Sequence, residues 1–136
     1  MGAWGTGPFD NDVAADWALE CARLADISFV GNTLDQVLAA GDDYLDADDA
    51  AEGVAAAEIA CRILGRASEP DGYSQPVDEW IERDKPSATP ALAVKAHEAI
   101  TRILTEPSEL LELWQASDDL AEWTAGMKAL AERCRP

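Results

Sequence analysis

The sequence predicts an all-α protein, and three observations predict it. Apolar residues recur at spacings of three and four along most of the chain. No window shows the two-residue alternation, rich in β-branched residues, that is typical of strands. Glycine, proline and capping residues divide the chain into six or seven helical segments. Because a chain of 136 residues buries about two thirds of its unfolded surface, we expect one compact, irregular bundle forming a single domain over residues 1–136.

The opening segment, MGAWGTGPFDND, combines three glycines with two aromatic residues. Leaving Trp4 and Phe9 in water costs about 1.5–3 kcal/mol each relative to burial. We therefore expect a loop that packs against the helices, although Trp4 could instead line a binding site. Asp10 is the predicted N-cap of the first helix, which runs to about Asp26.

Two further pairs of residues have the spacing of a capping box. Thr33 with Gln36 predicts the start of a second helix whose inward residues extend to Leu45. Asp49 with Glu52 repeats the spacing and predicts the start of a third helix. The third helix is apolar around most of its circumference, so we expect it to be the central helix. Gly65 is the predicted end of this helix.

The remaining helices have signals of the same kind. A short segment around Trp80 follows a loop rich in Ser, Pro, Asp and Gly. Proline is favoured at the first position of a helix, because the N–H group that it lacks would have no partner within the helix there. Serine and threonine are favoured at N-caps, because the side-chain oxygen accepts a hydrogen bond from a backbone N–H of the first turn. The later helices are predicted to begin at Thr89 with Pro90, at Ser108, and at Ser117 or Asp118.

The charge of the chain limits its partners. Against 27 acidic residues there are 10 basic ones, which gives a net charge of −17. Such a surface repels phosphate backbones and anionic lipids, so we expect no nucleic-acid and no membrane partner. A basic protein is the partner that this charge favours. With no apolar run of bilayer length and no signal peptide, the expected location is the cytoplasm.

The motifs of common catalytic and metal sites are absent from the sequence. The glycine-rich opening lacks the GK[ST] ending of a phosphate loop, and the acidic segments do not match a calcium loop. The only histidine, His97, lies in HEAIT without the second histidine of a zinc protease, and is interpreted as a boundary residue of its helix. Cys21, Cys61 and Cys134 are far apart and odd in number, which indicates buried thiols in a reducing compartment. We therefore assign no catalytic residue, metal ligand or cofactor.

Carboxylates alone can still hold magnesium, which leaves one enzyme hypothesis open. Glu79 with Glu82, and Glu109 with Glu112, share a helix face at three-residue spacing. The alternative function is therefore a Mg²⁺- or Mn²⁺-dependent enzyme acting on a nucleotide or another phosphorylated small molecule. Glu58 also interrupts the apolar third helix, but arginines follow it at four-residue steps, at Arg62 and Arg66, and predict an ion-paired stripe.

The densest charge on the chain lies between the second and third predicted helices. Helix capping and a solvated turn account for it, and a binding surface for a basic protein is the functional interpretation. The leading hypothesis is thus a non-enzymatic protein-binding or regulatory module of the inhibitor or immunity type, with its oligomeric state left open. The candidate interaction surface consists of Trp4, Asp42, Asp43, Asp46, Asp48, Asp49 and Glu52.

The opening MGAWGTGPFDNDVAADW resembles the start of a family of small bacterial proteins known as domain of unknown function 4259. The similarity continues through DDYLDADDAAEGVAAAE and SELLELW. The resemblance implies a bacterial cytosolic setting and an intact natural N-terminus, and it carries no activity or site residue to this chain. The residues that match the opening motif are Gly2, Trp4, Gly5, Gly7, Phe9, Asp10, Asn11, Asp12, Asp16 and Trp17.

Overall fold

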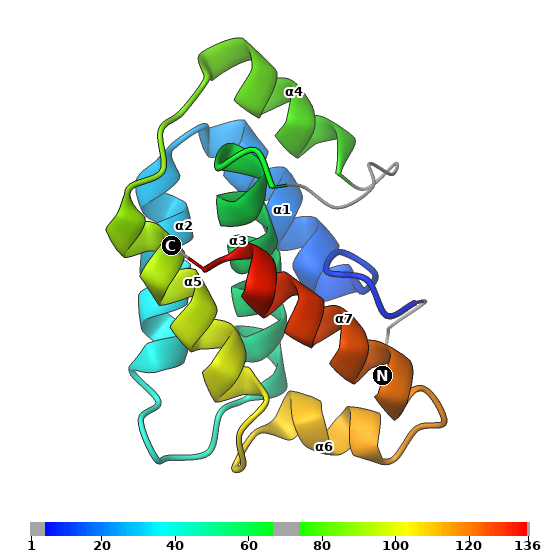
Figure 1. Ribbon diagram of the computed structural model, residues 1–136. Coiled ribbons are helices and arrows are strands. Elements are labelled where there is room, and N and C mark those ends of the chain that lie inside the picture. Colours follow the sequence, from blue (N-terminus) through cyan, green and yellow to red (C-terminus); the bar gives the residue numbers. More distant parts are fainter. Residues whose placement is uncertain (1–4, 67–73, 136) are drawn as a thin grey trace.

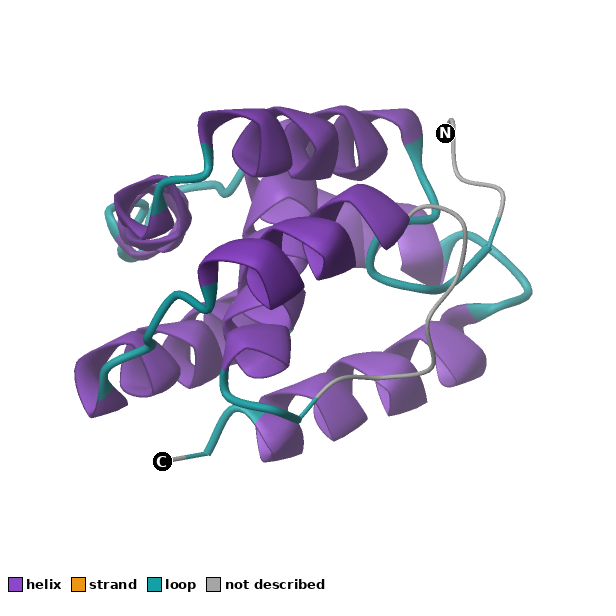
Figure 2. Cartoon of the chain, turned by 90° about the horizontal axis from the view of Figure 1, so that it is seen from above, coloured by secondary structure: helices purple, strands orange, loops and turns teal. Residues whose placement is uncertain are grey.

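The computed structural model describes residues 5–66 and 74–135, and this part of the chain contains seven α-helices and no strand (Figures 1 and 2). The predicted all-α bundle is therefore confirmed. In chain order the helices are α1 (Asp12–Leu24), α2 (Ile27–Leu38), α3 (Ala47–Ile63), α4 (Gln75–Asp84), α5 (Pro90–Ile103), α6 (Glu109–Gln115) and α7 (Leu120–Arg133).

Helix α3 is the centre of the bundle, as its apolar circumference predicts. It contacts each of the other six helices, and nearly every residue from Ala50 to Arg62 is buried. Gly53 permits a close approach of α2, because a Cβ atom at this position would lie 2.5 Å from Cγ2 of Val37. The small residues of α3 thus let its neighbours approach the backbone closely.

Several predicted helix ends are confirmed. Thr89 Oγ1 accepts a hydrogen bond from the Leu92 N–H (3.2 Å), with Pro90 as the first residue of α5. Ser108 caps α6 by accepting from the Leu111 N–H (3.5 Å). Gly65 follows α3 with a φ of +80°, a conformation that glycine adopts without the steric cost of a Cβ atom.

The predicted N-cap of the first helix is wrong by one residue. Asn11 caps α1, since its side chain accepts from the Ala14 N–H at 2.8 Å. The Asp10 carboxylate instead closes the preceding loop by accepting from the Gly7 N–H at 2.9 Å. A Cβ atom at Gly7 would lie 2.7 Å from that carboxylate, so a larger residue here would displace the Asp10 side chain.

The opening loop packs against the bundle over its described part. Phe9 is only 2% exposed, and the guanidinium carbon of Arg62 lies 5.8 Å from the centre of its ring. The expectation of a packed loop is met at Phe9. Trp4, the other aromatic residue of this loop, lies outside the described residues.

The predicted start of the second helix is also wrong. Asp26 caps α2 by accepting from the N–H of Ser28 (3.0 Å), so Thr33 lies inside the helix. The Thr33 hydroxyl donates to the Phe29 carbonyl (3.0 Å) and accepts from the Trp17 indole N–H (3.1 Å). Because α2 ends at Leu38, Leu45 follows the helix, although it is buried as predicted.

Two other starts differ by one to three residues. Asp46, and not Asp49, caps α3, since its carboxylate accepts from the N–H groups of Asp48 (2.7 Å) and Asp49 (3.0 Å). Asp119 occupies the N-cap position of α7. Ser117, which the sequence offers as a start, donates its hydroxyl to the Trp114 carbonyl at 2.8 Å. Asp118, the other predicted start, lies one residue before the N-cap.

The interpretation of the cysteines as buried thiols is confirmed. Cys21, Cys61 and Cys134 are free and fully buried. Burial raises the pKa of the Cys21 thiol to about 12, which keeps this residue protonated at neutral pH. Within the described ranges, no helix has the length and apolar character needed to cross a membrane.

Candidate binding cleft

The N-terminal ends of α1, α3 and α6 meet at one end of the bundle. Leu45, just before α3, forms two backbone hydrogen bonds with the chain before α6: its N–H donates to the Pro107 carbonyl (3.2 Å), and its carbonyl accepts from the Glu109 N–H (2.9 Å). The Glu109 carboxylate accepts from the Ala47 N–H at 2.8 Å. These bonds place the starts of α6 and α3 side by side.

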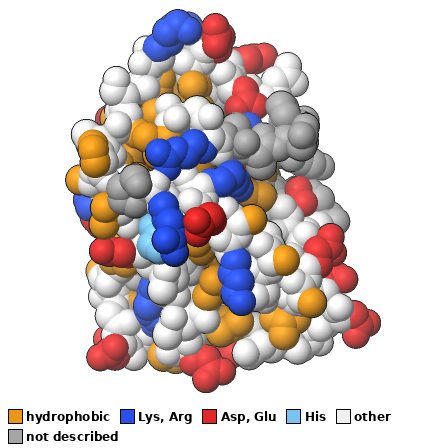
Figure 3. Space-filling model, in the orientation of Figure 1, with side chains coloured by type: hydrophobic (Ala, Val, Ile, Leu, Met, Phe, Trp, Pro, Cys, Tyr) orange, Lys and Arg blue, Asp and Glu red, His pale blue; other side chains and the backbone are white. Residues whose placement is uncertain are grey.

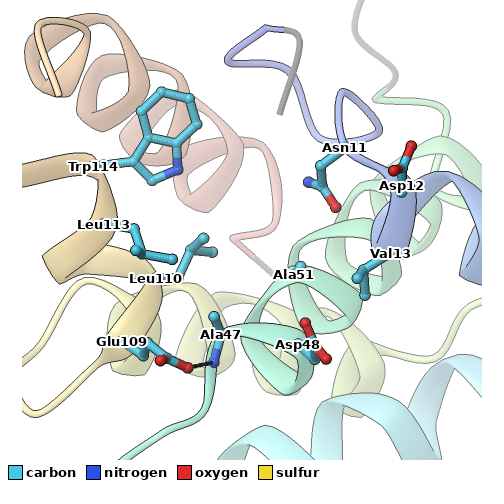
Figure 4. A pocket seen from close by; sticks show the side chains of 10 residues that line it. All are labelled: Asn11, Asp12, Val13, Ala47, Asp48, Ala51, Glu109, Leu110, Leu113 and Trp114. Atoms are coloured by element: carbon cyan, nitrogen blue, oxygen red, sulfur yellow. Dashed lines mark hydrogen bonds between the residues drawn. The ribbon is translucent and has the colours of Figure 1, made fainter. Parts of the chain in front are cut away.

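A cleft of about 400 Å³ opens between these helix ends (Figure 4). Leu110, Leu113 and Trp114 form its α6 wall, and Val13 lies across from them on α1. The Trp114 ring is held in place by a stacked contact with Trp123, with ring centres 5.7 Å apart. The residues that line the cleft are Asn11, Asp12, Val13, Ala47, Asp48, Ala51, Glu109, Leu110, Leu113 and Trp114.

Three carboxylates, from Asp12, Asp48 and Glu109, belong to this lining, and no basic residue does. Figure 4 shows them spread around the opening instead of gathered at one point. Within residues 5–66 and 74–135, no group of three or more His, Cys, Asp or Glu side chains could hold a metal ion. The cleft therefore combines an apolar wall with a distributed negative rim.

The predicted acidic surface lies beside the cleft, and Asp48 belongs to both. We call Asp42, Asp43, Asp46, Asp48, Asp49 and Glu52 the acidic corner. Asp42 and Asp43 are exposed in the loop between α2 and α3, Asp46 caps α3, and the other three lie in the first two turns of α3. None of the six forms an ion pair with another described residue.

Burial and neighbouring negative charges shift the ionisation of two residues of the acidic corner, Asp49 and Glu52. Burial, followed by the negative charges of Asp46 and Asp48, raises the pKa of Asp49 above its ordinary value. Burial also raises the pKa of Glu52, and the charges of Asp49, Asp48 and Asp46 add to the effect. A cation placed near the corner would relieve this repulsion and favour the ionised forms.

Arg102 fixes the loop that carries Asp42 and Asp43, a role that the sequence analysis missed. Its guanidinium donates to the carbonyl oxygens of Gly41 (2.8 Å), Asp43 (2.7 Å) and Pro107 (2.9 Å). No local pattern indicates these bonds, because Arg102 is about 60 residues away from the loop in sequence. Since these partners are backbone carbonyl groups, Arg102 forms no ion pair with the side chains of the acidic corner.

Basic side chains concentrate elsewhere on the molecule. In the view of Figure 3, Lys and Arg gather in the middle of the face, and Asp and Glu lie mainly along its margins. Arg66, just after α3, donates to the carbonyl oxygens of Arg133 (3.1 Å) and Arg135. The predicted pairing of Arg66 within a Glu58 stripe is therefore wrong, because backbone groups at the end of α7 bind this guanidinium instead.

Glu58 is the buried centre of a different charge network. Its side chain is fully buried and contacts Arg62 (Oε2 to Nε, 3.1 Å), as predicted, and Arg133 of α7 (Oε1 to Nη2, 2.8 Å). Arg62 also pairs with Asp78 of α4 at 2.8 Å. These contacts join α3, α4 and α7.

The other residues considered for chemistry have structural partners. Glu112 accepts from the Tyr44 hydroxyl (2.6 Å), which raises the pKa of Tyr44 to about 12. Glu79 accepts from Gln75 at 3.1 Å. Nδ1 of the half-buried His97 lies 2.8 Å from the Ala131 carbonyl oxygen, as suits a boundary residue.

A second cavity, of about 300 Å³, lies between the opening loop and α7. Arg133 is the one charged residue in its lining, and this side chain already pairs with the buried Glu58. The first cleft has unpaired charge at its rim and is therefore the stronger candidate for a binding site.

The chain folds into a small all-α bundle with a cleft beside a group of exposed carboxylates. Residues 2–126 of the chain match the family described as Domain of unknown function (DUF4259), and the chain belongs to this family. The resemblance noted in the opening motif is thus confirmed. No curated protein and no solved structure matches the chain.

Proposed function

We propose that this chain is a non-enzymatic module that binds a basic protein and regulates it, in the manner of an inhibitor or immunity protein of the bacterial cytoplasm. The observation that carries the proposal is the cleft, with an apolar wall and a carboxylate rim, beside an acidic corner that has no ion pairs among the described residues.

Exposed apolar groups support binding to a protein rather than solubility alone. Tyr44 is 52% exposed and Leu113 is 38% exposed, and the Tyr44 hydroxyl donates to Glu112, the residue before Leu113. Aromatic and aliphatic groups surrounded by charged side chains are typical of protein interfaces. Concentrated negative charge also accelerates association with a positively charged surface.

The test is capture of a partner from an extract of the source organism by the tagged protein. We expect a basic protein to be retained in about 0.05 M NaCl and released in about 0.5 M NaCl, because salt screens exposed charges. A variant with Asp42→Asn and Asp43→Asn should retain less of it, and the control with Glu82→Gln and Glu98→Gln should retain as much as the unmodified protein.

The control removes the same charge from exposed residues of α4 and α5, so it separates a local effect from a change in net charge. Equal retention by both variants, or no partner in low salt, would overturn the proposal.

A further inference from the structure

The walls of the cleft suit an occupant that is both apolar and cationic. Trp114 is fixed by its contact with Trp123, so the α6 wall exists before anything binds. Leu113 adds an apolar side chain that is 38% exposed. An occupant with an apolar stem would therefore bury carbon surface against α6 without rearranging the helix.

The rim requires positive charge on that occupant. Asp12 and Asp48 are exposed and have no ion pair among the described residues. Glu109 uses one oxygen to accept from the Ala47 N–H and still carries its negative charge into the lining. Three carboxylates with no basic residue among the lining groups are complementary to a cation.

The distribution of the carboxylates favours a guanidinium over a compact charge. Asp12, Asp48 and Glu109 come from three helices and surround the opening (Figure 4). A guanidinium has five N–H donors in a plane and is weakly hydrated, so it can donate to separated acceptors at the mouth of an apolar cleft. An ammonium group is compact and strongly hydrated.

We propose that the cleft binds an arginine side chain of the partner, together with the apolar residue next to it. The cleft volume of about 400 Å³ accommodates both side chains. The arginine stem lies against Leu113 and Trp114, and the guanidinium contacts Asp12 and Asp48. This inference rests on the proposed function, and it names the group of the partner that the module recognises.

The first experiment titrates the full chain with the peptide acetyl-Gly-Leu-Arg-Leu-Gly-amide and follows NMR signals in low salt. Twin peptides carry citrulline, which is uncharged and nearly the same shape, or lysine in place of arginine. We expect the Leu113 methyl and Trp114 indole signals to shift, and the arginine peptide to bind about tenfold more tightly than the citrulline peptide. The lysine peptide should bind with intermediate affinity.

Matched variants locate the binding. Leu113→Ser and Asp48→Asn should each weaken arginine-peptide binding by about fivefold or more. Leu19→Ser, at an exposed leucine of α1 (59%), and Glu82→Gln on α4 should leave it unchanged. Helix α4 lies at the opposite end of the molecule from α6 (Figure 1). Thermal melts of every variant verify that it is folded.

Equal binding of the arginine and citrulline peptides, no binding, or signal changes away from the cleft would overturn the inference. The capture experiment distinguishes a failure of the cleft inference from a failure of the proposed function. If capture depends on Asp42 and Asp43 but is unchanged by Leu113→Ser, the cleft inference fails and the proposed function stands. If capture is insensitive to the acidic corner, the proposed function itself fails.

Discussion

At the scale of single residues, Glu58 is a carboxylate buried in the hydrophobic core of the bundle. It lies in the central helix with its side chain at 0% exposure, and it is neutralised by arginines from two helices. Removing one partner of a buried ion pair leaves the other charge without compensation, which costs more than the pair itself contributes. Without Glu58, Arg62 keeps Asp78 as a partner, and Arg133 loses its carboxylate.

We therefore expect Glu58→Gln to lower the free energy of unfolding by about 3–5 kcal/mol, as measured by urea denaturation. Glu98→Gln, at an exposed residue of α5, is the control and should change stability by less than about 0.5 kcal/mol. A loss below about 1 kcal/mol at Glu58 would contradict this prediction.

At the scale of helices, two glycines inside helices differ in the space around them. A Cβ atom at Gly53 of α3 would lie 2.5 Å from Val37 and 3.4 Å from Ile103. A Cβ atom at Gly126 of α7 would have no heavy atom within 4 Å. The first glycine is required by packing, and the second only weakens its helix.

Alanine at each position should separate these effects. Gly126→Ala should stabilise the protein by about 0.5–1 kcal/mol, the helix propensity difference. Gly53→Ala gains the same propensity but overpacks the α2–α3 contact at a cost of about 1–3 kcal/mol, so we expect a net loss. Chemical denaturation measures both, and equal stabilisation by the two substitutions would contradict the packing argument.

The helix boundaries that the sequence predicts correctly are those that depend on nearby residues. The caps at Thr89 and Ser108 bond to backbone groups three residues away, and Gly65 ends its helix through its own φ angle. A local sequence pattern is therefore sufficient to predict these three boundaries. Thr33 has the spacing of a cap but bonds to Phe29 and to Trp17, a side chain on another helix. A local pattern contains no information on such a partner.

At the scale of the whole molecule, the surplus of negative charge should make stability depend on pH and salt. The fold raises the pKa values of Asp49 and Glu52 above their ordinary 3.8 and 4.5. Protonation of these two carboxylates therefore favours the folded state. This stabilisation is fully present at a pH below their ordinary pKa values, and it is lost as the pH rises through their raised pKa values in the folded protein.

In low salt we expect the Tm to rise as the pH is lowered from 7 toward the raised pKa values of Asp49 and Glu52, because these two carboxylates take up protons more readily in the folded state. Glu20, Asp26 and Asp84, whose pKa values are lowered by hydrogen bonds, remain ionised in that range. Added NaCl at pH 7 should raise the Tm in the same direction by screening. Glu52→Gln should reduce the pH effect in melts followed by circular dichroism, and a Tm that falls on this acidification would refute the argument.

The cleft is also a property of the whole molecule, which is why sequence predicted only part of it. The acidic corner was found because its residues are neighbours in the chain, and it includes Asp48. Asp12, Glu109 and Trp114 come from segments that the bundle brings together, and no local pattern in the sequence indicates that they meet. The cleft became visible only when the positions of α1, α3 and α6 were known.

The family match ends before the last helix does. The match stops at residue 126, within α7, but Arg133, which neutralises Glu58, lies seven residues further on. Leu130 and Cys134, both in the hydrophobic core, are also beyond that limit. The shared sequence signature is therefore shorter than the unit that folds, and a truncation at its edge would remove one of the two arginines that pair with the buried Glu58.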